Sequence, residues 1–355
     1  MDLLAFLKDS VTKDVSDIFI VAGKPLSYKV GTILHSYDDE RLSPEKTNLL
    51  ITEIYQMADN RNTDRLLKNG DDDFSFSLTG ISRFRVSAYK QRGSLAAVIR
   101  VVALTLPNPT KLHIPDFVLD LANIPRGMIL VSGPSGCGKS TPLPCLIDII
   151  NEQRAGHIIT LEDPIEFLHP HKASIVSQRE IEMDTVSYPS ALRAALRQNP
   201  DVILIGELRD PQSISIALTA AETGHLVIST LHTLGAANSM DRLVDAFEPS
   251  QQQQVRMQLS MVLQAVVSQQ LVPTISNDVF PVFEVMLCNN AIRNMIRDGR
   301  THQIDSVIFS SSASGMVSMD TSLIDLYKRG MITAQEAELR SLSPEQLVRQ
   351  LNDVK

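Results

Sequence analysis

The chain has 355 residues, enough for two domains, and its 43% hydrophobic and 21% charged residues exclude a disordered protein. Its 33 basic and 41 acidic residues give a net charge of −8, which argues against a general nucleic-acid coat or a polybasic membrane binder. The three cysteines form no C-x-x-C pair, which favours a reducing cytoplasm over disulfides or structural zinc, and no apolar run approaches the roughly 18 residues of a membrane helix, so direct membrane insertion is not expected.

The N-terminal third predicts a small α+β domain over residues 1–104. Ser43 and Pro44 have the residue types of a helix cap and a first helical position, and they open a helix that runs to about Met57. Alternating apolar segments predict strands at residues 17–21, 74–78, 82–89 and 96–102. A proline-rich stretch at 106–111 predicts a linker, placed at 105–111.

Residues 112–355 predict a second domain of α/β type. Short apolar runs at residues 128–131, 157–161, 202–205 and 225–229 alternate with helical segments. This alternation predicts a parallel sheet with helices on both faces. After Pro249 the pattern becomes mainly helical, and apolar residues at helical spacing predict a helix from Gln252 to Leu271.

The strand at 128–131 is followed by a glycine-rich segment that fits the phosphate-loop pattern G-x-x-x-x-G-K-[ST]. In this pattern, glycines turn backbone N–H groups toward phosphates, the lysine adds a charge at the β- and γ-phosphates, and the serine hydroxyl binds Mg²⁺. A chance glycine turn is the alternative. The residues expected to hold ATP are Gly133, Pro134, Ser135, Gly136, Cys137, Gly138, Lys139, Ser140 and Thr141.

Two prolines conflict with the helix that should follow this loop. If Gly138 is near the helix cap, Pro142 lies near the fourth helical position and Pro144 near the sixth. An interior proline costs about 3 kcal/mol because it lacks an N–H and crowds the preceding turn. The sequence therefore predicts a kink or a widened turn at residues 141–144.

Acidic residues follow two of the predicted strands. Glu207 ends the run at 202–205 and is the candidate base or water-positioning group, with a surface acid as the alternative. Glu162, Asp163 and Glu166 follow the run at 157–161 and are candidates for metal or water contact, Glu162 and Asp163 with Ser140 for Mg²⁺. A solvated acidic turn is the alternative for these three residues.

Histidines and arginines complete the candidate set. His225 begins the run at 225–229 and His232 follows it, and a histidine at either position could sense the γ-phosphate or form structural hydrogen bonds. Of several arginines on the N-terminal strands, Arg85 and Arg100 are favoured as functional, because arginine can stabilise phosphoryl-transfer charge from a neighbouring subunit. Solvated strand faces are the alternative.

Four segments in order, GPSGCGKST, ITLEDPIEF, VILIGELRD and TAAETGHLVISTLHT, resemble the Walker A, Asp box, Walker B and His box of the secretion-type hexameric ATPases that drive type II secretion and type IV pili. AIRNMIR at 291–297, followed by THQI, resembles the C-terminal signature of the type IV pilus retraction ATPases. SRFRVSAY and QRG resemble the N-terminal domain of that family. The resemblance covers nearly the whole chain.

The resemblance implies a PAS-like N-terminal domain, a RecA-like ATPase domain and a homohexamer, with ATP between the domains. It implies that Glu207 is the catalytic glutamate, that Glu162 and Glu166 are Asp-box acids, and that His232 lies near the nucleotide. Arginines of the first domain would reach the site. An inner-membrane platform protein of the pilus machine would be the partner, at the cytoplasmic face of the inner membrane.

Three functions follow from these observations. The first is a motor ATPase that retracts type IV pili in twitching motility, favoured by the four motif segments and by AIRNMIR. The lack of the extra N-terminal domain and the four-cysteine motif usual in assembly ATPases favours retraction over assembly. The second is an ATP-binding switch or structural ring with little turnover, suggested by the two prolines. The third is a related secretion or DNA-transfer ATPase, against which the net charge argues.

Overall fold

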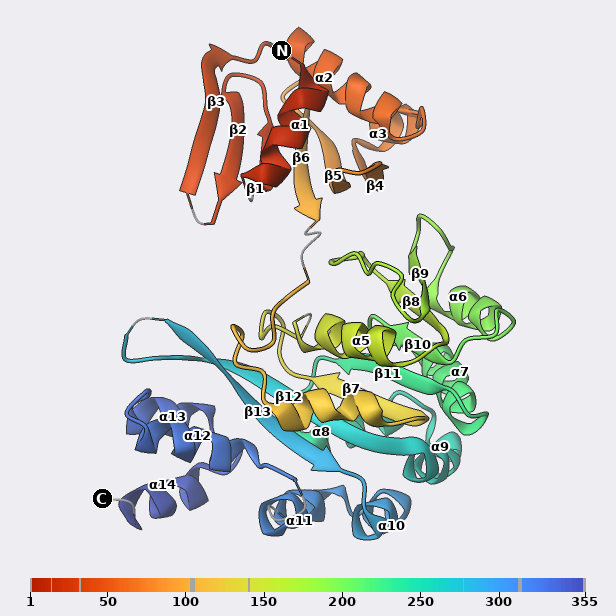
Figure 1. Cartoon of the computed structure of the whole chain (residues 1–355), viewed down its shortest axis with the longest axis vertical. Helices are drawn as coiled ribbons and strands as arrows, with labels where there is room; N and C mark the ends of the chain where they lie inside the picture. The colour runs from red at the N-terminus through yellow and green to blue at the C-terminus, as the bar shows by residue number, and fades with distance from the viewer. Residues whose placement is uncertain are drawn as a thin grey trace. The chain divides into compact units, whose positions relative to one another are not determined.

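The computed structural model describes residues 2–13, 15–31, 33–102, 106–139, 141–276, 278–311 and 315–353. Its contacts divide the chain into two compact units, drawn in Figure 1. The first comprises Met1–Thr105 with Ile165–Leu168, and the second comprises Leu106–Pro164 with His169–Lys355.

The first unit is built on a six-stranded antiparallel sheet with three helices. The strand order is β3-β2-β1-β6-β5-β4. The predicted strands and the predicted helix are confirmed, and the Ser43 side chain caps α2 by accepting a hydrogen bond from the Lys46 N–H at 3.2 Å. The elements are α1 (Leu3–Thr12), β1 (Val15–Ile20), β2 (Pro25–Val30), β3 (Ile33–Arg41), α2 (Pro44–Met57), α3 (Asp64–Asn69), β4 (Asp71–Leu78), β5 (Ser82–Gln91) and β6 (Ser94–Val102).

The second unit is built on a seven-stranded sheet with the order β13-β12-β7-β11-β10-β8-β9. Six strands are parallel, and only β13, at one edge, runs antiparallel to its neighbour. All four apolar runs predicted as parallel strands are confirmed. The strands are β7 (Gly127–Ser132), β8 (His157–Glu162), β9 (Ile175–Glu180), β10 (Val202–Ile205), β11 (Leu226–Leu231), β12 (Leu263–Pro273) and β13 (Val279–Leu287).

Alternate residues of the central strands belong to two separate hydrophobic clusters, one on each face of this sheet. On β7, Met128 and Leu130 pack with helices α6–α11, whereas Ile129 and Val131 pack with α4, η1 and α5. A strand buried on both faces must be apolar at every position, which is why these strands read as continuous apolar runs. The same packing places helices on the two sides of the sheet in Figure 1.

The helices of the second unit fall into three groups. On one face lie α4 (Asp116–Leu119), η1 (Asp120–Asn123) and α5 (Pro142–Gln153). On the other lie α6 (Tyr188–Ala195), α7 (Pro211–Glu222), α8 (Ala236–Asp245), α9 (Pro249–Val262), α10 (Asn290–Asp298), η2 (Thr301–Gln303) and α11 (Ile304–Ser310). A third cluster joins the β12–β13 hairpin to α12 (Met319–Lys328), α13 (Ala334–Arg340) and α14 (Pro344–Asp353).

The predicted helix from Gln252 to Leu271 is wrong in its second half. Helix α9 ends at Val262, and β12 begins at the next residue, Leu263. The apolar residues at helical spacing belong partly to a strand that pairs with β7 on one side and β13 on the other. Pairing in the centre of a sheet has overridden the local periodicity.

The predicted placement of the two prolines inside a helix is also wrong. Helix α5 begins at Pro142 after Thr141, so the prolines occupy its first and third positions, and it runs as one helix to Gln153. The N–H groups of a first helical turn have no partner within the helix, so prolines there remove no hydrogen bond. A turn closed by the Thr141 N–H and the Gly138 carbonyl, at 3.0 Å, replaces the expected early start.

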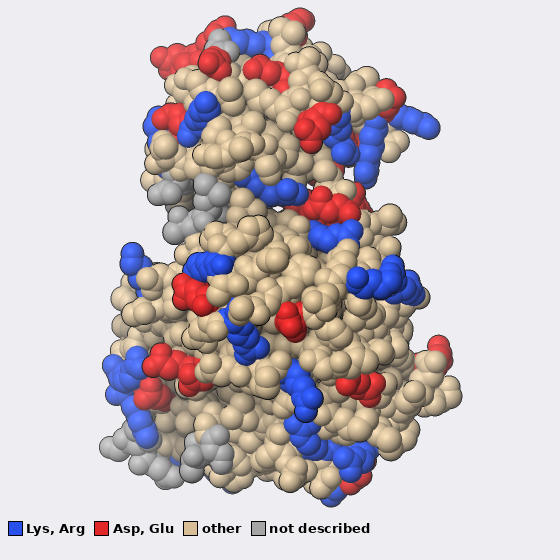
Figure 2. All heavy atoms as spheres, turned by 45° about the vertical axis from the view of Figure 1, so that its right-hand side comes forward, with Lys and Arg blue, Asp and Glu red and all other residues tan. Residues whose placement is uncertain are grey.

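The surface drawn in Figure 2 carries interspersed acidic and basic side chains rather than one large basic patch. Among the helices that the structure describes, none combines the length and apolar character needed to cross a membrane.

Candidate active site

The four motif segments end at one edge of the second sheet. The strands β7, β11, β10 and β8 are parallel neighbours that pair up to their carboxyl ends: Ser132 pairs with Leu231, and Ile205, the last residue of β10, pairs with Leu161 and Ser229. The segments that follow these residues therefore start at the same carboxyl edge. This edge is where ligands bind in open α/β sheets.

The loop after β7 has the backbone that a phosphate cradle requires. Gly133, Gly136 and Gly138 have φ of +148°, +76° and +83°, a region that favours glycine. A Cβ at Gly133 would lie 2.3 Å from the carbonyl oxygen of Gln269 and 2.6 Å from Cys137 Sγ, so the loop passes β12 too closely for any side chain. The segment thus fits a nucleotide's phosphates. Ser140, the predicted hydroxyl ligand, lies outside the described residues.

Lys139 is held by its own loop. Its Nζ donates hydrogen bonds to the carbonyl oxygens of Gly133 at 2.6 Å and Pro134 at 2.9 Å, and it makes no ion pair with any carboxylate that the structure describes. Burial lowers the pKa of Lys139, and the charges of Cys137 and Glu207 oppose that effect. A partly desolvated cation bonded only to carbonyls is suited to receive an anion.

Glu207 lies at the end of β10, where its side chain is only 14% exposed. Its Oε2 forms an ion pair with Arg209 Nε at 2.6 Å and accepts a hydrogen bond from His232 Nε2 at 3.1 Å. Both partners contact the same carboxylate oxygen, Oε2. The structure therefore brings together two sequence candidates, Glu207 and His232.

The acids after β8 occupy different environments. Glu162 Oε1 accepts hydrogen bonds from Thr160 Oγ1 at 2.6 Å and from Gln178 Nε2 at 3.2 Å, which fix its carboxylate. Asp163 and Glu166 are exposed, and Glu166 belongs to the segment grouped with the first unit. The described residues contain no cluster of three or more His, Cys, Asp or Glu side chains placed to hold a metal ion.

Arg85 and Arg100 are direct cross-strand partners on β5 and β6 of the first unit. Arg100 Nε forms an ion pair with Asp17 Oδ1 at 3.1 Å, while its side chain stays 68% exposed. Like charges placed directly opposite each other in a sheet are destabilising. The ion pair with Asp17 offsets part of this repulsion.

Sequence reasoning missed two residues of this edge. Gln269 is 2% exposed, its amide lies against the phosphate loop, and its Oε1 has no hydrogen-bond partner among the described residues. Tyr188 begins α6, and its hydroxyl lies over Gly206. A lone glutamine in a strand and a lone tyrosine at a helix start carry no sequence signal of their own, because only the tertiary fold brings them to the loop.

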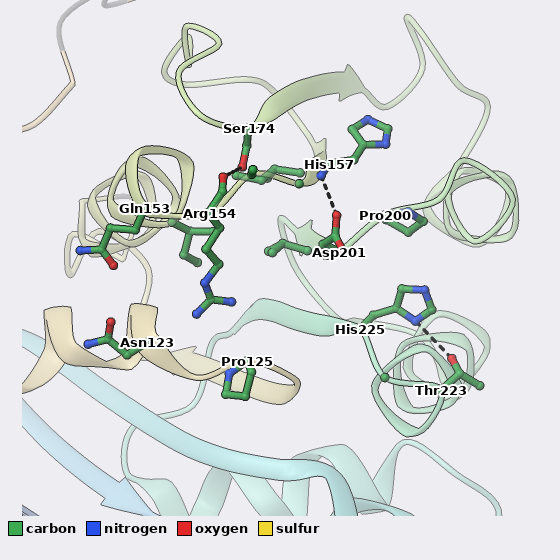
Figure 3. Close-up of a pocket in the computed structure, with 16 residues that line it drawn as sticks. Asn123, Pro125, Gln153, Arg154, His157, Ser174, Pro200, Asp201, Thr223 and His225 are labelled. Carbon is green, nitrogen blue, oxygen red and sulfur yellow. Dashed lines mark hydrogen bonds between the residues drawn. The ribbon is translucent and has the colours of Figure 1, made fainter.

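The opposite, amino edge of the sheet holds a pocket of about 600 Å³, shown in Figure 3. Its polar groups already serve the fold. Asp201 Oδ2 accepts the His157 N–H at 2.8 Å, and an Arg154 amino group donates to the carbonyls of Ala122 and Ile124. His225 Nδ1 lies 2.8 Å from the Ala220 carbonyl oxygen, so His225 makes a structural contact. None of the other motif candidates lines this pocket.

Comparisons with known proteins identify the family of this chain. A family model described as type II/IV secretion system protein matches residues 2–348. The type IV pilus retraction ATPase PilT of Pseudomonas aeruginosa is 38% identical over 97% of this chain and 99% of its own length. The type IV pilus ATPase PilU of the same organism is also 38% identical, over 95% of this chain and 88% of its own.

The crystal structure of the pilus retraction motor PilT with bound ADP matches this fold with a TM-score of 0.89. That match has 42% sequence identity and covers 98% of this chain and 99% of the other. It confirms the α/β fold class. The chain belongs to the type II/IV secretion system protein family, and within that family to the PilT/PilU-type nucleotide-binding ATPases of type IV pili.

Proposed function

We propose that this protein is a hexameric motor that hydrolyses ATP to withdraw pilin subunits from a type IV pilus. One observation supports this most directly: the nearly buried Glu207 lies at the same sheet edge as the phosphate loop, oriented by Arg209 and His232. A carboxylate in this position can activate water for attack on a bound γ-phosphate.

In the proposed reaction, the backbone N–H groups of the loop Gly133–Thr141, other than that of Pro134, which has none, hold the phosphates together with the Lys139 ammonium. The attacking water forms a bond to the γ-phosphorus while the bond to the β–γ bridging oxygen breaks. The bridging oxygen leaves with its electron pair on ADP, and the water proton passes to Glu207. His232 transmits the presence of the γ-phosphate through its contact with Glu207.

Mg²⁺ is part of this proposal, with Ser140, Glu162 and Asp163 as the oxygen donors. Carboxylate and hydroxyl oxygens are the donors that Mg²⁺ prefers, and Glu162 already has a fixed carboxylate. Bound there, the ion would neutralise charge on the β- and γ-phosphate oxygens. Glu166 is proposed as a further acid of this group.

The proposed ring is a homohexamer in which Arg85 and Arg100 reach the nucleotide of a neighbouring subunit. Their pairing on β5 and β6, with a largely exposed Arg100, supports such a role. We place the ring in the cytoplasm at the inner membrane, bound to the platform protein of the pilus machine and not to nucleic acid. We propose retraction as the function of this protein. A PilU-like role is the second candidate, because the chain is equally identical, 38%, to PilT and to PilU of Pseudomonas aeruginosa.

The first test is Mg²⁺-dependent ATP hydrolysis by the purified full chain, with Glu207→Gln and Lys139→Ala. We expect both substitutions to abolish turnover, with Glu207→Gln retaining ATP binding. Tight binding without wild-type turnover would contradict the motor function. Expression in a piliated strain that lacks its own retraction ATPase, with PilU intact, then separates the two candidates: restored retraction supports the first, and unchanged loss supports the PilU-like role.

A further inference from the structure

Tyr188 reaches the candidate site from a helix that no motif includes. It is the first residue of α6, where Ser187 caps the helix and Pro189 follows. Its ring packs against the larger hydrophobic cluster of the second unit, which anchors the side chain. The hydroxyl end extends beyond this cluster to the carboxyl edge of the sheet.

The position of the hydroxyl is fixed relative to the ends of β10 and β8. A Cβ at Gly206 would lie 2.6 Å from Tyr188 Oη, 3.3 Å from the Leu161 carbonyl oxygen and 3.5 Å from Glu162 Cα. The Gly206 N–H also donates to the Leu161 carbonyl at 2.7 Å, which holds the two strand ends together. The hydroxyl therefore lies beside Gly206, the residue before Glu207, where the ends of β10 and β8 meet.

The charges of three carboxylates and of Arg209 act on the Tyr188 hydroxyl in opposite directions. Burial raises the pKa of Tyr188, and the charges of Glu207, Asp163 and Glu162 raise it further, so the side chain remains an O–H donor throughout the physiological range. No direct hydrogen bond joins Tyr188 to Glu207 among the interactions that the described residues make. A water molecule can link a hydroxyl and a carboxylate that make no direct hydrogen bond, by accepting from one and donating to the other.

We propose that the Tyr188 hydroxyl holds the attacking water between itself and Glu207, and so is a water-positioning residue of this enzyme. The inference rests on the proposed ATP hydrolysis. Tyr188 leaves the transfer of the proton to Glu207 unchanged and fixes the water oxygen in line with the γ-phosphorus. Gly206 serves the same end, because a side chain there would displace the hydroxyl.

The test compares steady-state ATP hydrolysis by the wild-type full chain, Tyr188→Phe and Tyr327→Phe. The first substitution removes only the hydroxyl, and the second is a matched control on α12, outside the candidate site. We expect Tyr188→Phe to lower kcat about 10- to 100-fold, the value of one hydrogen bond to a polar or charged group in the transition state. KM and the Kd of ADP should stay within about twofold of the wild-type values. The unfolding temperature should stay within a few degrees of that of the wild type.

Each other outcome overturns the inference in a distinguishable way. If the wild type hydrolyses ATP and Tyr188→Phe has the same kcat, Tyr188 does not position the water, while the proposed function stands. If Tyr188→Phe loses ADP binding in parallel with kcat, the hydroxyl supports the fold rather than the water. If the wild type has no turnover, the proposed function fails, and the role of Tyr188 fails with it.

Discussion

Protonation of Glu284 should stabilise the second unit by an amount that follows from its surroundings. Glu284 lies on β13 and is 2% exposed. Its Oε1 accepts the Ala236 N–H at 2.8 Å, and its Oε2 accepts the Met319 N–H at 3.2 Å, so one carboxyl joins the first turns of α8 and α12. Burial raises the pKa of Glu284 to about 7, with the charges of Asp305 and Asp320 adding to the effect and the two N–H groups opposing it.

The sign follows from the direction of this pKa change. The folded protein binds the proton more tightly than the unfolded chain, in which the carboxyl has its ordinary pKa near 4.5. The stabilisation is therefore complete below pH 4.5 and is lost as the pH rises through 7. Two and a half pH units at about 1.4 kcal/mol each amount to about 3.5 kcal/mol.

The perturbation is Glu284→Gln, which keeps the shape of the side chain and removes its titration. Urea unfolding gives the free energy of unfolding at pH 5, 6, 7 and 8. Circular dichroism monitors the transition, because the chain has no tryptophan for fluorescence. The stability of the wild type relative to Glu284→Gln should fall by about 2.5 kcal/mol between pH 5 and 8, because part of the loss already occurs below pH 5. The exposed Glu345→Gln on α14 is the control and should follow the wild type. Parallel curves for wild type and Glu284→Gln would refute the reasoning.

Two further predictions concern the phosphate loop and α10. Gly133→Ala should abolish ADP binding and lower the free energy of unfolding by about 2–4 kcal/mol, because its Cβ meets the backbone of β12. The Cβ of Gly136→Ala meets nothing within 4 Å, so this variant should be destabilised only by the strain of its positive φ, about 1 kcal/mol. Equal urea midpoints for these two variants would contradict this account. Arg293→Ala should cost about 2 kcal/mol, because its guanidinium donates to the carbonyls of Ser260 and Met261 at the end of α9 and to Gln264 Oε1. The exposed Arg297→Ala is its control, and an equal loss in both variants would argue against this capping role.

The sequence was sufficient to predict the central strands but not β12. Residues 202–205 are apolar at every position and are bounded by polar or glycine residues, so local pattern and tertiary environment agree. Leu263 follows α9 without any turn signal, and Val262 and Val266 continue the helical spacing. Only the pairing of β12 with β7 and β13 decides its structure, and a single sequence does not contain that pairing.

The candidate site shows the same division between local and tertiary information. Glu207 and His232 could be predicted because each follows an apolar run, and parallel strands bring such positions to one edge. The proline prediction failed because it took Gly138 as the helix cap, whereas the helix begins three residues after Lys139. Tyr188 could not be predicted, since its approach to Gly206 depends on how α6 packs against the sheet.

The hydrogen bonds of Lys139 fix where its charge lies before any phosphate is considered. The ammonium has three N–H donors, and the carbonyls of Gly133 and Pro134 accept two of them. A phosphate oxygen that takes one of these two donors replaces a neutral acceptor with an anionic one, which is the stronger partner for an ammonium. The loop that carries Lys139 therefore also sets the direction from which a phosphate can reach it.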